Sequence, residues 1–164
     1  MDSGPDGSPS IEGASAVGGS VMSLAWGGLL LLGLGGAAGA AEFRSVAEPA
    51  AVLYDAPSLK ATKVLILGAG YPVEVVVSIE GWLKVRDEKG SLVWAEAGRL
   101  IAKRTVLARA ATDLREGPDD GAKIVLRVDA GVALEFVEQS GPWAKLRHRD
   151  GETGYARVNG FWGL

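Results

Sequence analysis

The chain has 164 residues, enough for one or two small domains, and contains no cysteine and one histidine, His148. The lack of cysteine excludes a disulfide framework, a thiolate zinc site and a cysteine nucleophile. The formal net charge is −3, and acidic and basic residues balance after Ala41, so we expect neither a clustered basic surface for nucleic acid nor an electrostatic attraction to an anionic membrane.

The first 41 residues differ in composition from the rest of the chain. Residues 2–20 are rich in Gly, Ser, Pro and Ala without apolar periodicity, which predicts disorder. Residues 21–41 carry no charge and end in the small residues Ala38-Gly39-Ala40, a pattern typical of an apolar, helical signal peptide and its cleavage site. We therefore expect cleavage near Ala40 or Ala41 and a periplasmic or secreted mature protein.

Two features of this leader leave alternatives open. No basic residue precedes the apolar run, although translation from Met22 would give a compact leader. The uncharged run approaches the roughly 20 residues that span a bilayer, so an uncleaved inner-membrane anchor, with the rest of the chain facing the periplasm, is the second reading. A buried core helix is the third. Any membrane contact is expected through this segment alone.

From residue 42 the chain contains one pattern written twice. A shift of about 61 positions places Pro57 on Pro118, Trp82 on Trp143 and Gly90 on Gly151. Turn glycines, a proline, a tryptophan and alternating apolar residues are the positions that a small β-fold has to fix. We expect one domain over residues 42–103 and another over 104–164, with an ordered connector at 101–110 because it is apolar and basic rather than rich in Gly and Ser.

Alternating apolar residues separated by tight turns predict five short strands in each copy. In the first copy they cover residues 51–54, 64–67, 73–79, 82–86 and 91–95. In the second copy they cover residues 113–115, 124–128, 132–139, 143–149 and 152–156. Strands this short, joined by turns this tight, predict an all-β protein of two small tandem barrels.

Period-two alternation assigns the faces of these strands. Leu134 and Phe136 should point into the second core, as should Ala144 and Leu146 on the next strand. Trp143 falls on the opposite parity, with the charged residues of its strand, and should point outward.

The second copy contains a set of motifs that together indicate a family: Leu114-Arg115-Glu-Gly117-Pro118, Ile124-Val-Leu126, Gly131-Val-Ala-Leu134, Trp143-Ala-Lys145-Leu146 and Gly154-Tyr155-Ala156. With these motifs it resembles the bacterial SH3-like (SH3b) domain family. The first copy resembles a divergent member, in which Tyr54 stands at the position of Arg115 and Val93 at that of Gly154. The resemblance implies exported, non-catalytic modules, often paired and often attached to cell-wall enzymes, that bind peptidoglycan or proteins.

Aromatic residues at equivalent positions of the two copies are the candidate ligand-binding residues: Trp82 and Trp94 in the first, Trp143 and Tyr155 in the second. Aromatic side chains with polar tips bind peptides and sugars with a large contact area and little entropy cost. Arg115 can hold a ligand carboxylate. The alternative is that the aromatic residues pack in the core or between copies, and that Arg115 pairs with a nearby acid.

No catalytic, metal or cofactor site is expected. His148 lies between two arginines without a serine or cysteine nucleophile beside it, and no second histidine supports a transition-metal site. Asp119 and Asp120 are too few for a calcium loop and predict a turn. We therefore expect a non-enzymatic cell-envelope module that binds peptidoglycan or an envelope protein. The alternative is a membrane-tethered scaffold whose two barrels pack on each other without a small ligand.

Overall fold

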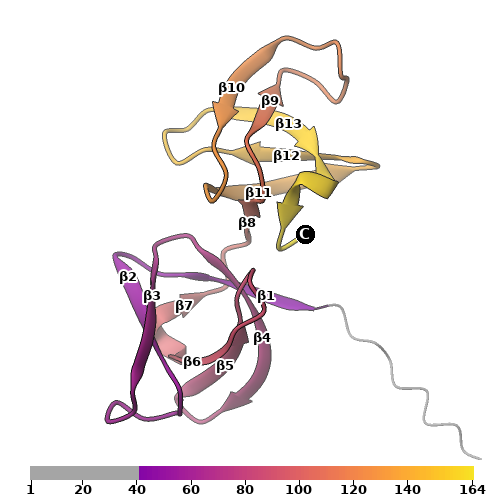
Figure 1. Ribbon diagram of the computed structural model, residues 1–164. Helices are drawn as coiled ribbons and strands as arrows, with labels where there is room; N and C mark the ends of the chain where they lie inside the picture. The colour runs from indigo at the N-terminus through magenta and orange to yellow at the C-terminus, as the bar shows by residue number, and fades with distance from the viewer. Residues whose placement is uncertain (1–40) are drawn as a thin grey trace, which may run out of the picture. The chain divides into compact units, whose positions relative to one another are not determined.

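The computed structural model describes residues 41–164, which belong to one compact unit and form two seven-stranded antiparallel sheets (Figure 1). The predictions about the leader concern residues 1–40 and lie outside the described residues. Between residues 41 and 164 no helix has the length and hydropathy needed to cross a membrane.

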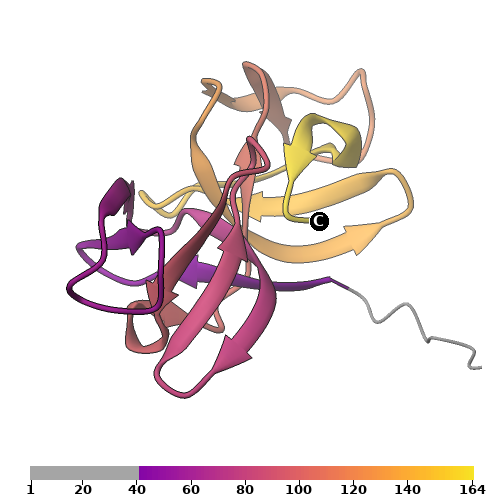
Figure 2. The same ribbon diagram turned by 60° about the horizontal axis from the view of Figure 1, so that its bottom comes forward.

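The first barrel consists of the strands of the first copy and a short 3₁₀ turn, Ala97–Arg99. Its strands are β1 (Glu42–Val46), β2 (Ala50–Tyr54), β3 (Lys63–Gly68), β4 (Pro72–Ile79), β5 (Trp82–Arg86), β6 (Leu92–Glu96) and β7 (Leu100–Ile101). They lie in the order β3-β2-β6-β5-β4-β1-β7. Figure 2 shows this sheet curling around its own interior.

The second barrel repeats this arrangement strand for strand. Its strands are β8 (Thr105–Ala108), β9 (Thr112–Arg115), β10 (Ile124–Val128), β11 (Ala133–Ser140), β12 (Trp143–Arg147), β13 (Thr153–Arg157) and β14 (Phe161–Trp162), with a 3₁₀ turn at Val158–Gly160. Their order, β10-β9-β13-β12-β11-β8-β14, is the order of the first barrel shifted by seven strands. The predicted all-β fold of two tandem copies is confirmed.

All ten predicted strands are present, and two corrections are needed. The strands β1, β7, β8 and β14 were not predicted, because each is short and pairs with a strand distant in sequence rather than with a hairpin neighbour. The predicted strand 143–149 ends at Arg147, so His148 lies in a turn and not on a strand.

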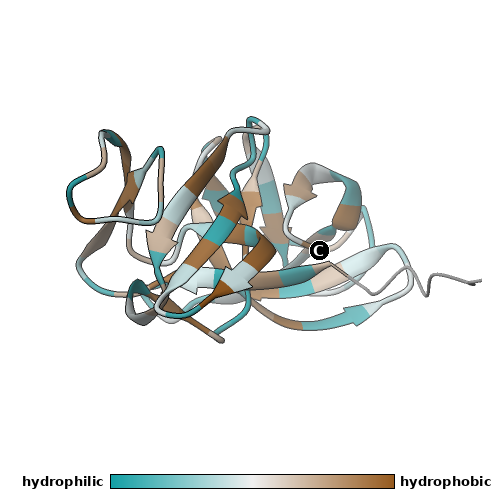
Figure 3. Ribbon diagram, turned by 90° about the horizontal axis from the view of Figure 1, so that it is seen from below, coloured by the Kyte–Doolittle hydropathy of each residue, from teal (hydrophilic) through white to brown (hydrophobic). Residues whose placement is uncertain are grey.

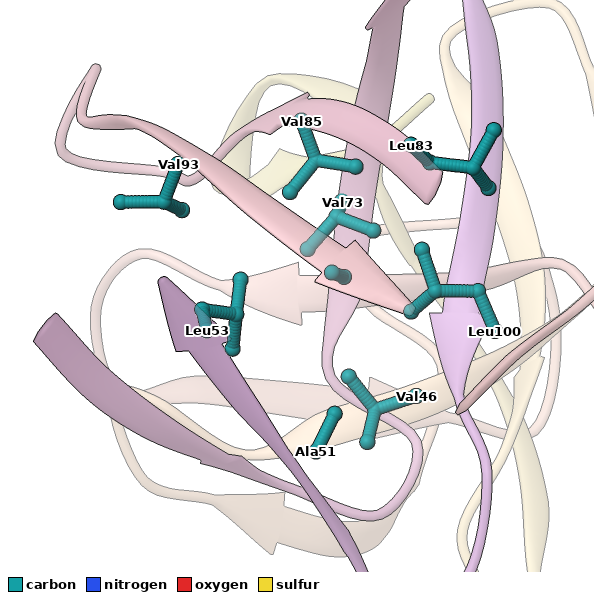
Figure 4. Close-up of a cluster of buried hydrophobic side chains, with 9 residues drawn as sticks. Val46, Ala51, Leu53, Val73, Leu83, Val85, Val93 and Leu100 are labelled. Atoms are coloured by element: carbon teal, nitrogen blue, oxygen red, sulfur yellow. The ribbon is translucent and has the colours of Figure 1, made fainter. Parts of the chain in front are cut away.

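Each barrel has its own hydrophobic core. Figure 3 shows hydrophobic and hydrophilic residues alternating along the strands. In the first barrel Leu53, Val73 and Val85 are fully buried and point toward one another (Figure 4). In the second barrel Leu114, Leu134, Ala144 and Leu146 are buried, which confirms the predicted inward faces of β11 and β12. Both cores are complete within residues 46–164, so a fragment starting at residue 41 retains them.

The predicted ordered connector contains β8, and a small polar network joins it to β1. The Thr105 hydroxyl donates to the Gly70 carbonyl at 2.7 Å and its oxygen lies 2.6 Å from Ser45 Oγ. The single Ser45 hydroxyl proton can go either to the Thr105 oxygen or to the Lys103 carbonyl, which Ser45 Oγ also contacts. Since Ser45 and Thr105 are both buried, these hydrogen bonds satisfy groups that would otherwise be costly to remove from water.

Candidate functional site

The second barrel has a pocket of about 590 Å³ where β9, β10 and the ends of β12 and β13 meet the loop 116–123. Its charged and aromatic lining residues are Arg115, Arg127, Arg157, Asp113, Asp120, Asp129 and Trp143. Three guanidinium groups and three carboxylates therefore share one pocket with an indole ring. Such a surface complements a ligand that carries both charges and a planar or apolar portion.

Trp143 forms the apolar part of this pocket. Strand pairing places it opposite Arg157, across β12 and β13. The Arg157 guanidinium carbon lies 4.7 Å from the centre of the indole ring, within cation–π distance. Trp143 lies on the parity predicted for it, yet it is only 7% exposed. The predicted parity is therefore observed, and the ring is buried because the Arg157 side chain from the neighbouring strand covers it.

Arg157 also pairs with Asp120 from the loop 116–123. Its Nε lies 3.2 Å from Asp120 Oδ1, and its second nitrogen contacts the other carboxylate oxygen. The hydrogen bond from Arg157 lowers the pKa of Asp120, and the same bond raises the pKa of Arg157. We call the set Trp143, Arg157 and Asp120 the Arg157 bridge. It holds the loop against the sheet on one side of the pocket.

Arg115 lines the same pocket. Its Nη1 donates to the Ala122 carbonyl at 2.8 Å, and its Nη2 lies 3.9 Å from Asp113 Oδ2. Asp113 also pairs with Arg127, at 3.1 Å. Arg115 is thus held by the loop backbone and by an acid of its own strand. The side chain of Arg127 is 80% exposed, so a ligand can reach its guanidinium although Nε pairs with Asp113.

The five predicted binding residues do not form one groove. Trp143 and Arg115 line the same pocket. Tyr155 pairs with Arg115 across β13 and β9 and lies outside that lining. Its ring faces Lys145, whose Nζ is 5.8 Å from the centroid. In the second barrel the structure therefore brings two of the three predicted residues together.

Trp82 and Trp94 belong to the first barrel, where an aromatic residue replaces the arginine. Tyr54 stands at the position of Arg115, packs edge-on against Trp82 at 5.5 Å and pairs with Trp94 across β2 and β6. Trp82 lines a separate pocket with Leu59 and Glu96. Glu96 occupies the position of Arg157, opposite its tryptophan, so the first barrel has no counterpart of the Arg157 bridge.

The charged residues that line the pocket of the second barrel are largely absent from the first barrel. Val52, Tyr54, Leu59 and Ile66 stand 61 positions before Asp113, Arg115, Asp120 and Arg127. Leu59 and Ile66 are 64% and 69% exposed. The two barrels share a backbone but present different surfaces at this place, one charged and one apolar.

Sequence reasoning missed Arg157, Arg127 and the role of Asp120. Asp120 was interpreted only as part of a turn. Its neighbour Asp119 does cap that turn, since its carboxylate accepts a hydrogen bond from Gly121 N at 2.7 Å. The hairpin closed by Asp150-Gly151 is the signal that could have found Arg157, because its register sets residue 157 opposite Trp143.

Comparison with known proteins identifies the family. The bacterial SH3 domain matches this chain twice, at residues 47–101 and 109–163. The chain therefore belongs to the bacterial SH3 domain family, with two tandem copies, as predicted from its motifs. A search of curated proteins found no match to the chain.

Among solved structures, the chain is similar to NlpC2 and NlpC1 from Trichomonas vaginalis, at 15% and 16% identity and TM-scores of 0.35 and 0.34. These matches cover 75% and 74% of this chain and 48% and 45% of theirs. It is also similar to an NlpC/P60 family protein from Bacillus cereus ATCC 10987, at 18% identity and a TM-score of 0.34, over 73% of this chain and 55% of that one. The chain thus spans about half the length of these structures.

Proposed function

We propose that this protein is an exported, non-catalytic binding module of the cell envelope that recognises peptidoglycan or an envelope protein through the pocket beside Trp143. Membership of the bacterial SH3 domain family supports the general role. The observation that carries the proposal is the gathering of three guanidinium groups, three carboxylates and one indole ring in a pocket of about 590 Å³.

The chemistry of that pocket favours a short peptide with both charges. A guanidinium group binds a carboxylate through two parallel hydrogen bonds, and Arg127 is exposed enough to do so. Asp129 and Asp113 can accept hydrogen bonds from an ammonium group. The stem peptides of peptidoglycan and the charged segments of envelope proteins both supply such groups, together with an apolar portion for the indole edge.

The test is retention of the 41–164 fragment on purified cell-wall sacculi. Arg127→Gln removes an exposed guanidinium from the pocket, and Arg115→Gln removes the one beside it. A ligand hydrogen bond to a charged group contributes about 1.5–3 kcal/mol, so each variant should weaken retention about tenfold or more. Arg99→Gln, which removes a cation outside the pocket, is the matched control and should bind as wild type.

Two results would contradict the proposal. The binding role would be contradicted if wild-type protein is not retained on sacculi and captures no envelope protein. Soluble cell-wall fragments released by the purified protein would show an enzyme, against the expected lack of a catalytic set. Melting curves of each variant establish that weakened retention does not come from unfolding.

A second candidate function is that of a scaffold whose two barrels pack on each other. It is favoured by the buried hydrogen bonds between Ser45, Thr105 and the Gly70 carbonyl, and by the edge-on contact of Phe43 with Trp162 at 5.2 Å. The scaffold would be favoured if both arginine variants are retained on sacculi as well as wild type, and if Thr105→Val disrupts the packing of the two barrels on each other.

A further inference from the structure

The turn between β12 and β13 gathers three potential metal ligands. His148 Nδ1 lies 3.2 Å from Asp150 Oδ2 and 3.9 Å from Glu152 Oε2. One ligand atom from each residue lies within 4.8 Å of the others. Among the residues that the structure describes, this is the one group of three such side chains.

The backbone of the turn is closed by its own hydrogen bonds. His148 N donates to the Glu152 carbonyl at 2.8 Å, and Gly151 N donates to the His148 carbonyl at 2.9 Å. Gly151 has a φ of 100°, which a residue with a side chain rarely adopts. This turn fixes the spacing of residues 148, 150 and 152 and directs the three side chains to one point.

The same turn in the first barrel shows that these side chains are not needed to form it. Asp87 N donates to the Ser91 carbonyl at 3.1 Å, and Gly90 N donates to the Asp87 carbonyl at 3.0 Å. The residues 61 positions before His148, Asp150 and Glu152 are Asp87, Lys89 and Ser91. There the Asp87 carboxylate accepts a hydrogen bond from Ser91 N at 2.7 Å, and a lysine stands where the middle ligand would be.

Few hydrogen-bond donors approach the three ligand atoms of the second-barrel turn. The Asp150 backbone N–H donates to His148 Nδ1, at the long distance of 3.4 Å. Two carboxylate oxygens and an imidazole nitrogen are all hydrogen-bond acceptors when the ring nitrogen carries no proton. Arg149 approaches only Asp150 Oδ1, at 4.0 Å, and its side chain is 89% exposed. Asp150 Oδ2 and Glu152 Oε2 therefore face the ring nitrogen from exposed side chains, an arrangement that a metal ion can complete.

We propose that His148 Nδ1, one Asp150 oxygen and one Glu152 oxygen bind a divalent first-row transition-metal ion, with zinc as the reference case. Imidazole nitrogen and carboxylate oxygen suit zinc and its neighbours, and three protein ligands plus water make an open zinc site. Ligand atoms about 2.0–2.2 Å from zinc lie about 3.3–3.6 Å apart at tetrahedral angles.

The observed separations are close to what such an ion requires. The distance of 3.2 Å between His148 and Asp150 already fits, and only the Glu152 side chain has to move inward. Glu152 is 52% exposed, so it has room to change rotamer. The single histidine was predicted to bind no metal, because only a second histidine or a cysteine was considered as a partner. The alternation His-x-Asp-x-Glu across a tight turn is the signal that was missed.

The experiment is a zinc titration of the 41–164 fragment by calorimetry in a buffer that does not chelate metals. Wild type should bind one equivalent. His148→Gln, Asp150→Asn and Glu152→Gln should each weaken binding by about 10- to 100-fold, the cost seen even when only a supporting contact of a ligand is lost. Glu80→Gln removes an exposed acid from another turn and should leave the affinity unchanged.

Localisation provides the second measurement. Co²⁺ added to ¹⁵N-labelled protein should broaden the amide signals of residues 147–153 and leave those of the matched turn, residues 87–91, sharp. Lack of a single binding equivalent, equal weakening by Glu80→Gln, or broadening at both turns alike would overturn the site. None of these outcomes depends on the proposed envelope ligand.

Discussion

The guanidinium of Arg157 lies 4.7 Å from the ring centre of Trp143 and pairs at the same time with Asp120. One side chain thereby ties the loop 116–123 to β12 and β13, whose ends line the pocket. The tryptophan that the sequence presents as a binding residue is for this reason buried in the free protein. A ligand that stacks on the indole has to displace Arg157 or approach the ring from its edge.

Removal of Arg157 should uncover the indole. In Arg157→Gln we expect the Trp143 side-chain NH signal to shift and iodide or acrylamide to quench tryptophan fluorescence more strongly, because the covering guanidinium is gone. Arg127→Gln is the matched control, since Arg127 lies in the same pocket but pairs with Asp113. Equal quenching in wild type and Arg157→Gln would contradict the covering role.

The ion pair of the Arg157 bridge should contribute to stability in a pH-dependent way. The pKa of Asp120 is lowered in the folded state by the hydrogen bond from Arg157. A carboxyl with a lowered folded pKa stabilises the protein fully above its unfolded value and loses that contribution as pH falls through the folded value.

We therefore expect Asp120→Asn to melt below wild type at neutral pH. This difference in melting temperature should begin to shrink below pH 3.8, the ordinary pKa of an aspartate carboxyl. It should be gone once the Asp120 carboxyl is protonated in the folded protein. Arg157→Gln removes the same ion pair, so the difference in melting temperature between this variant and wild type should narrow over the same pH range. Melting curves recorded across that range measure both. A difference between Asp120→Asn and wild type that persists at the acid end would rule out the ion pair as its source, whereas Arg157→Gln also loses the contact with the Trp143 ring.

Gly154 is required by the close approach of β13 to β9. A Cβ atom there would lie 2.8 Å from Leu114 Cβ and 3.0 Å from the Arg115 carbonyl oxygen. Gly154→Ala should therefore destabilise the second barrel by about 1–3 kcal/mol, the usual cost of overpacking, and should displace Arg115. Urea unfolding measures the loss. Gly117→Ala, where a Cβ would meet nothing within 4 Å, should be close to neutral.

Thr105 joins β8 to the first barrel through its hydroxyl group. Thr105→Val leaves the partly buried Gly70 carbonyl without this donor, which costs up to about 1–3 kcal/mol. We expect that loss in urea unfolding, and none for Thr153→Val on an exposed strand position. A Thr105→Val protein as stable as wild type would show that water replaces the hydroxyl.

The parts of the fold that were predictable are those set by neighbours in sequence. Hairpins with tight turns, such as the one closed by Asp150-Gly151, define their own strands and register, and alternation correctly placed Leu134 and Leu146 in the core. By contrast, β1 lies beside β4 and β7, and its five residues have too little alternation to identify a strand without those partners.

The site was less predictable than the fold because its chemistry depends on contacts across loops. Trp143 and Arg115 were predicted, and both line the pocket. The burial of Trp143 depends on Arg157, and the position of Arg157 depends in turn on Asp120, which is 37 residues away along the chain. Composition and periodicity contain no information about such a contact. Hairpin register predicts that Arg157 lies opposite Trp143, but not that Arg157 pairs with Asp120.

Because the two barrels have the same strand order, each surface of one barrel can be compared with the equivalent surface of the other. Trp82 and Trp143 occupy equivalent places on equivalent strands, so side chains can be transplanted between them without redesigning the backbone. Installing Arg at positions 54, 66 and 96 and Asp at 59 would give the first barrel counterparts of Arg115, Arg127, Arg157 and Asp120, while positions 52 and 68 would remain uncharged. The gain or loss of recognition after such grafting would assign specificity to those four side chains directly.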